Sequence, residues 1–168
     1  MKLDSDEWNT RLSRADKKIR HMLESAHGCG PFDGGCLIVA QALQAATGGE
    51  LVVLVDRYDE ALHAAIMKDG QLWDYDGPMF PEAFLHRYNN LVEEEKYLLV
   101  RHREFRDYDL MEAMENDALA LRMSVLFRGV LPPELRTGDW QVPALKRPDL
   151  DWEGCEVAVP SPTQPSMV

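Results

Sequence analysis

Apolar residues recur at steps of three and four along two long stretches of the chain, the spacing that gathers them on one side of an α-helix. The first stretch lies between Asp4 and Gly28, and the second runs from Asp109 to Phe127. The apolar positions of the first are Trp8, Leu12, Ala15, Ile19, Leu23 and Ala26, and those of the second are Leu110, Met114, Ala118, Leu121 and Val125. Each stretch is predicted to be one amphipathic helix, with methionine filling core space.

Between these helices, apolar runs alternate with turns rich in glycine or charge. The Ala-rich run that begins at Cys36 stops at Gly48, as expected of a buried helix with a glycine cap. Residues 51–55 are β-branched and apolar, which predicts a covered strand, and residues 56–60 form a charged turn. Two more elements are expected, a helix over residues 81–88, which opens on proline, and a strand over residues 97–100.

A β-hairpin is predicted between His63 and Gly77, with Asp69-Gly70 as its two-residue turn. In that register Lys68 pairs with Gln71, Met67 with Leu72, Ala65 with Asp74 and His63 with Asp76. The period of two then places His63, Asp74 and Asp76 on one face, with Asp76 opposite the histidine and Asp74 on the diagonal.

The length and composition predict one packed domain with an extension. A chain of 168 residues that is 45% hydrophobic can bury one core. We expect an α+β fold over residues 1–129, in which an N-terminal helix and the Cys36 helix pack on a small, mostly antiparallel sheet of about four to five strands. Residues 130–159 are proline-containing and are expected to dock in part through Trp140 and Trp152. Residues 160–168 are expected to be disordered.

The charge narrows the possible partners. A formal net charge of −11 argues against nucleic acid and against anionic lipid, both of which require a basic face, and it leaves basic protein partners open. The three cysteines cannot all pair within the chain, and residues 1–7 lack the features of a signal peptide. A reduced, cytoplasmic protein without a membrane span is expected. The sequence does not predict an oligomeric state.

Cys36 is the first candidate for chemistry. It follows Gly34-Gly35 and begins the predicted buried helix, where the free N–H groups of the first turn and the helix dipole stabilise a thiolate. His63, with an aspartate from the hairpin, supplies the base and the acid of a Cys-His-Asp triad. The alternative is that His63 begins a half-exposed strand and that Asp74 and Asp76 are turn residues before Gly77.

Over residues 28–77 the sequence resembles the papain-like superfamily in the wide sense, which includes NlpC-type peptidases and transglutaminase-like proteins. The resemblance implies that Cys36 is the nucleophile, that His63 is the general base, and that Asp74 orients the histidine, with Asp76 as its rival. Papain-type peptidases carry a glutamine shortly before the cysteine, which this chain lacks. The oxyanion hole would therefore come from the Cys36 N–H and its loop.

These residues predict a cysteine-dependent hydrolase or acyl transferase, acting as a peptidase, isopeptidase, amidase or deamidase on a protein or peptide substrate, and the acidic charge leaves a basic substrate open. No cofactor and no metal are expected. The alternative is an acidic, non-catalytic inhibitor of phage or mobile-element type that occupies a basic site on a host protein.

Cys29 allows three interpretations. It could join His27, Cys36 and Cys155 as a zinc ligand, although their spacing is not that of a common zinc finger. It could form a reversible disulfide with Cys36 across the glycine loop, or it could be an incidental thiol.

Overall fold

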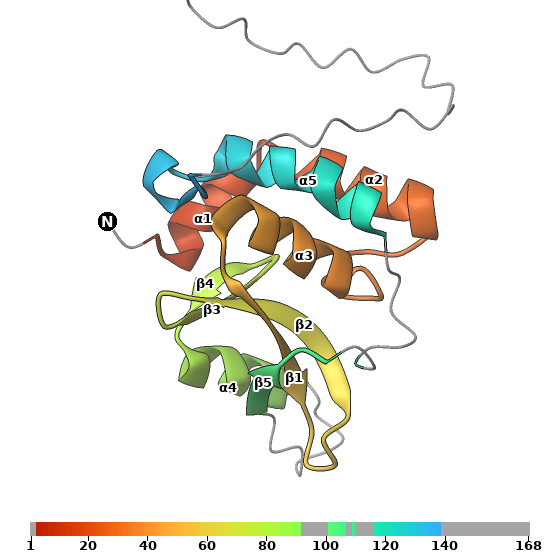
Figure 1. The fold of residues 1–168 in the computed structure, drawn as a ribbon, viewed down its shortest axis with the longest axis vertical. Helices are drawn as coiled ribbons and strands as arrows, with labels where there is room; N and C mark the ends of the chain where they lie inside the picture. The colour runs from red at the N-terminus through yellow and green to blue at the C-terminus, as the bar shows by residue number, and fades with distance from the viewer. Residues whose placement is uncertain (1–2, 92–100, 107–108, 110–115, 139–168) are drawn as a thin grey trace, which may run out of the picture.

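The computed structural model describes residues 3–91, 101–106, 109 and 116–138, which form an α+β domain (Figure 1). The helices are α1 (Ser5–Leu12), α2 (Asp16–His27), α3 (Cys36–Thr47), α4 (Pro81–Leu91) and α5 (Asp117–Val130), and the 3₁₀ turn η1 (Pro133–Leu135) follows α5. The strands are β1 (Glu50–Val55), β2 (Ala61–Lys68), β3 (Gln71–Asp74), β4 (Gly77–Met79) and β5 (Arg101–Glu104).

The described strands form one sheet in the order β4-β3-β2-β1-β5, and every neighbouring pair is antiparallel. Helices α1, α2, α3 and α5 lie on one side of this sheet, and α4 lies on the other (Figure 1). The expected α+β class is therefore confirmed, as is the mostly antiparallel sheet.

Helix α3 is the centre of the core. Nine of its twelve residues are buried, because one side of it packs on β2 and the other on α5. Apart from Gln41, Gln44 and Thr47 its residues are apolar or cysteine, as suits a helix enclosed on two sides. A smaller apolar cluster on the opposite face of the sheet joins Phe84 of α4 to Val52, Leu54, Ala65 and Leu72.

The hairpin turn is confirmed at Asp69-Gly70, where positive φ angles of 50° and 75° match the turn that joins two twisted strands tightly. The ladder contains Lys68 with Gln71 and Met67 with Leu72, as expected.

The predicted hairpin register fails beyond this ladder. The ladder between β2 and β3 stops at Ile66 with Trp73, and β3 ends one residue later at Asp74, so the expected pairs of Ala65 with Asp74 and of His63 with Asp76 do not form. Asp74 Oδ1 accepts the N–H of Asp76 at 2.9 Å, and this local bond turns the chain into β4.

The first predicted helix is two helices. The apolar spacing continues across the break, but α1 ends at Leu12 and α2 begins at Asp16. At the break the N–H groups of Arg14 and Ala15 bond to carbonyls three residues back, which tightens the chain and ends α1. The break lets Asp16 accept a hydrogen bond of 2.7 Å from the Tyr75 hydroxyl, a contact that periodicity cannot foresee.

Several expectations concern parts of the chain outside the described residues. These parts are the strand over residues 97–100, residues 110–115 of the second amphipathic helix, and the extension and tail beyond residue 138. Helix α5 covers the C-terminal part of that second helix and continues to Val130. In the part of the chain that is described, no helix has the length and apolar character needed to cross a bilayer.

Candidate active site

Cys36 is the first residue of α3, and its side chain faces the sheet. The loop before it is closed by a hydrogen bond of 3.0 Å from the Gly35 N–H to the Gly30 carbonyl. A Cβ on Gly35 would lie only 2.4 Å from that carbonyl oxygen, so the tight approach requires glycine. Cys36 is 7% exposed and belongs to the main core cluster.

The structure brings Cys36, His63 and Asp74 together from three different elements. His63, on β2, is 3% exposed, and its Nε2 lies 3.2 Å from Oδ2 of Asp74 at the end of β3. The imidazole also interacts with the Cys36 thiol, and this interaction lowers the thiol pKa. The thiol, the imidazole and the carboxylate thus lie in the order that a cysteine triad requires.

The thiol and the imidazole shift each other's protonation in opposite directions. Burial raises the pKa of Cys36, but the hydrogen bond and charge of His63, with the N–H groups of Ala64 and Leu37, outweigh it and lower the pKa overall. Burial lowers the pKa of His63, yet its bonds to Asp74 and Cys36 raise that pKa to about 9. Both shifts favour a thiolate-imidazolium pair near neutral pH.

Asp74 is held by a residue that the sequence did not single out. Arg87 of α4 donates to Oδ2 of Asp74, the oxygen that also faces His63, and to Oδ2 of Asp76 at 2.9 Å. Asp76 therefore pairs with the arginine, not with the histidine. Burial and the neighbouring Asp74 raise the pKa of Asp76. The sequence shows only that Arg87 lies in a helix that begins at Pro81. It gives no sign that Arg87 contacts Asp74 and Asp76.

Two aromatic rings cover His63, and neither was identified from the sequence. Tyr88 of α4 lies with its ring centroid 4.9 Å from the imidazole, and Phe32, from the loop before Cys36, stacks on it at 6.1 Å. Phe32 is 45% exposed, whereas His63 is buried. The loop side chain thus separates the imidazole from solvent.

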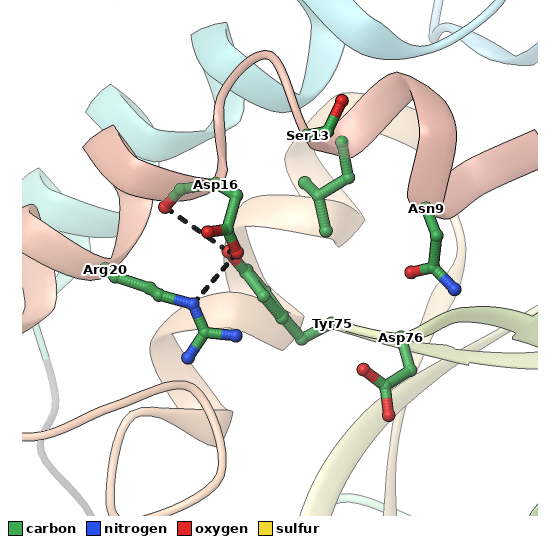
Figure 2. Close-up of a pocket in the computed structure, with 7 residues that line it drawn as sticks. Asn9, Ser13, Asp16, Arg20, Tyr75 and Asp76 are labelled. Carbon is green, nitrogen blue, oxygen red and sulfur yellow. Dashed lines mark hydrogen bonds and ion pairs between the residues drawn. The ribbon is translucent and has the colours of Figure 1, made fainter.

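A polar pocket of about 250 Å³ lies beside this site, and none of the three residues lines it. In Figure 2, Asn9 and Asp76 lie on one side of the Tyr75 ring, and Asp16 and Arg20 lie near its hydroxyl. Asp76 connects the pocket to the site, because its N–H binds Asp74.

The zinc hypothesis for Cys29 gains no support from the described residues. They contain no group of three or more His, Cys, Asp or Glu side chains placed to hold a metal ion. His27 Nε2 lies 3.1 Å from the side-chain nitrogen of Asn116. Cys29 is partly exposed, and Cys155 lies outside the described residues.

Comparison of the chain with protein-family models, curated proteins and solved structures found no match. Its function is therefore inferred from the geometry and electrostatics of Cys36, His63 and Asp74.

Proposed function

We propose that the protein is a cysteine-dependent hydrolase or acyl transferase that acts on amide bonds of a protein or peptide. The observation that carries this proposal is a buried thiol whose pKa is lowered rather than raised, through a histidine held by a buried carboxylate. Burial of such groups is costly for folding unless each is paired. Clusters of strongly shifted groups are typical of catalytic sites.

In the proposed reaction the Cys36 thiolate attacks the carbonyl carbon of the substrate, and a carbon-sulfur bond forms. Cys36 is the first residue of α3, so the helix does not use its backbone N–H, and this N–H would donate to the developing oxyanion. The His63 imidazolium then gives its proton to the leaving amine as the carbon-nitrogen bond breaks. Water or an acceptor amine next attacks the thioester, with His63 as base, and the thiolate is regenerated.

Asp74 and Arg87 would act on the histidine rather than on the substrate. Asp74 Oδ2 fixes the orientation of the ring, and the Arg87 guanidinium fixes Asp74 from the other side. Because Asp74 is only 1% exposed, the positive charge of Arg87 also offsets the cost of burying that carboxylate.

The test is a comparison of thiol reactivities within one molecule. At neutral pH, iodoacetamide should modify Cys36 at least about tenfold faster than Cys29, because burial, Asp33 and Cys36 raise the pKa of Cys29. Peptide mapping by mass spectrometry measures both rates, and Cys36→Ala should remove the fast reaction. Equal rates would overturn the proposal and favour the acidic inhibitor, which needs no activated thiol.

A second measurement tests acyl transfer itself. p-Nitrophenyl acetate should release a burst of nitrophenol and leave one acetyl group on Cys36, which is then lost by hydrolysis. Cys36→Ser keeps the size of the side chain but should lose the burst. A burst that survives in Cys36→Ser, or an acetyl group on another residue, would exclude Cys36 as the nucleophile.

A further inference from the structure

Cys29 and Cys36 flank the two ends of one closed loop, Cys29 before it and Cys36 after it. The hydrogen bond between the Gly35 N–H and the Gly30 carbonyl closes this loop at 3.0 Å. Cys29 directly precedes Gly30, and Cys36 directly follows Gly35, so the closure brings the two cysteines to the same end of the loop. Cys29 also packs against the core cluster to which Cys36 belongs.

The residues at the point where the loop closes are glycines, at positions 30, 34 and 35, so no side chain separates the two cysteines there. Gly34 has a φ of +103°, and a Cβ placed there would lie 3.5 Å from the Cβ of Cys29. Cys29 therefore lies against the backbone just before Cys36. Burial, Asp33 and the charge of Cys36 together raise the pKa of Cys29, so the Cys36 sulfur lies within electrostatic range of Cys29.

From this loop geometry we propose that Cys29 and Cys36 are a redox pair, in which a hydroperoxide oxidises Cys36 and Cys29 resolves the product into a disulfide. The inference rests on the thiolate of the proposed function but requires no substrate. Disulfides form where the Cα atoms are about 4.4–6.8 Å apart. The glycines at positions 30, 34 and 35 give the loop the freedom to reach that geometry.

The chemistry balances with one molecule of hydrogen peroxide, the simplest hydroperoxide. The Cys36 thiolate attacks one peroxide oxygen, the O–O bond breaks, and the departing oxygen takes a proton to leave as water, while Cys36 becomes a sulfenic acid. The Cys29 sulfur then attacks the Cys36 sulfur, the S–O bond breaks, and the hydroxide takes the Cys29 proton as a second water. Two thiols are oxidised to one disulfide, and a dithiol reverses the change.

The different environments of the two thiols determine the order of these steps. Cys36 carries the lowered pKa and is oxidised first, whereas Cys29 is the more exposed of the two and remains a thiol until the sulfenic acid forms. The disulfide removes the nucleophile from the site. Oxidation would therefore stop acyl transfer without consuming the protein.

The experiment treats the full chain with hydrogen peroxide at neutral pH and maps the products by mass spectrometry without reduction. The expected product is a peptide pair joined through Cys29 and Cys36, with loss of fast iodoacetamide labelling at Cys36 and its return after dithiothreitol. Disulfides through Cys155 or between chains, or direct conversion of Cys36 to a sulfinic acid, would overturn the inference.

Variants separate this inference from the proposed function. In Cys29→Ser, peroxide should convert Cys36 to the sulfinic acid, so that dithiothreitol no longer restores labelling. Cys155→Ser is the matched control and should behave like the unaltered chain. Fast alkylation of Cys36 without a Cys29-Cys36 disulfide would reject the redox pair alone. A slow Cys36 would reject the proposed function.

Discussion

The indole N–H of Trp8 donates a hydrogen bond of 2.8 Å to the carbonyl oxygen of Tyr75, 67 positions away along the chain. Tyr75 directly follows Asp74, so this bond fixes the turn in which β3 ends and the carboxylate of the site is placed. Both side chains are buried, and Trp8 also stacks on Phe127 of α5 at 5.9 Å. Helix α1 therefore supports the turn that places Asp74.

The closeness of Trp8 to this turn predicts an unequal effect of two glycine substitutions. Gly77 has a φ of +93°, and a Cβ there would lie 2.3 Å from Cδ1 of Trp8. Gly70 has a similar φ of +75°, but a Cβ placed there would meet no atom within 4 Å. Gly70→Ala should lower the free energy of unfolding by about 1 kcal/mol, through backbone strain alone.

Gly77→Ala should cost about 1–3 kcal/mol more than this control, because the indole has to move. Chemical denaturation of the two variants measures the difference through the shift in midpoint. Equal midpoints would show that Trp8 does not press on Gly77, and would contradict the role of α1 in fixing the turn.

His63→Ala should raise the pKa of the Cys36 thiol, because the variant removes the imidazolium that stabilises the thiolate. In the unaltered chain the alkylation rate of Cys36 should level off below pH 9, the ordinary thiol value, whereas that of Cys29 should still rise there. Mass-spectrometric rates over a pH series provide the measurement. An unchanged profile in His63→Ala would mean that His63 does not act on Cys36.

The raised pKa of His63 predicts an upper pH limit for the proposed acyl transfer. The imidazolium must protonate the leaving amine, and it is present below its folded pKa of about 9 and lost as the pH rises through that value. Turnover of an amide substrate should therefore fall above about pH 9, while alkylation of the thiolate continues. A fall that is already complete at neutral pH would contradict this value.

The two aspartates should differ when each is changed to asparagine. Asp74→Asn removes the charge that faces His63 at 3.2 Å, and a loss of about tenfold or more in thiol reactivity and in turnover is expected. Asp76→Asn removes only the outer partner of Arg87 and should have a smaller effect. If Asp76→Asn is the more damaging, the assignment of Asp74 fails.

Phe32→Ala should speed the alkylation of Cys36 several-fold. Its ring stacks on His63 from the exposed side, and at 45% exposure its removal should have little effect on the unfolding temperature. Tyr58→Ala is the control, since that ring is 67% exposed in the turn between β1 and β2. The same rate in both variants would show that Phe32 does not limit access to the site.

The local signals in the sequence were sufficient for much of the fold. The helix that begins at Cys36, the covered strand after Gly49 and the turn at Asp69-Gly70 follow from short-range periodicity and turn chemistry, and all three are present. The break between α1 and α2 could not be predicted, since the apolar spacing continues across it and the contact of Asp16 with Tyr75 is long-range.

The site was predictable only in part, for the same reason. The predicted helix start marked Cys36, and the predicted hairpin marked His63 and Asp74, which the structure brings together. The choice between the two aspartates depended on where β3 ends, which a side-chain bond within the turn decides. Arg87 and Phe32 approach from α4 and from the loop, and only the tertiary structure brings them to the site.

Because β3 is short, it leaves part of the edge of β2 without a described partner strand. Strand β2 pairs with β1 from Ala61 to Met67, but with β3 only from Ile66 to Lys68. Among the described strands, the half of β2 that carries His63 thus has a neighbour on one side only, and the N–H of Ala64 in this half helps to lower the pKa of Cys36. A longer β3 would pair with this part of β2. The chemistry of this protein would then depend as much on where a strand stops as on which side chains it carries.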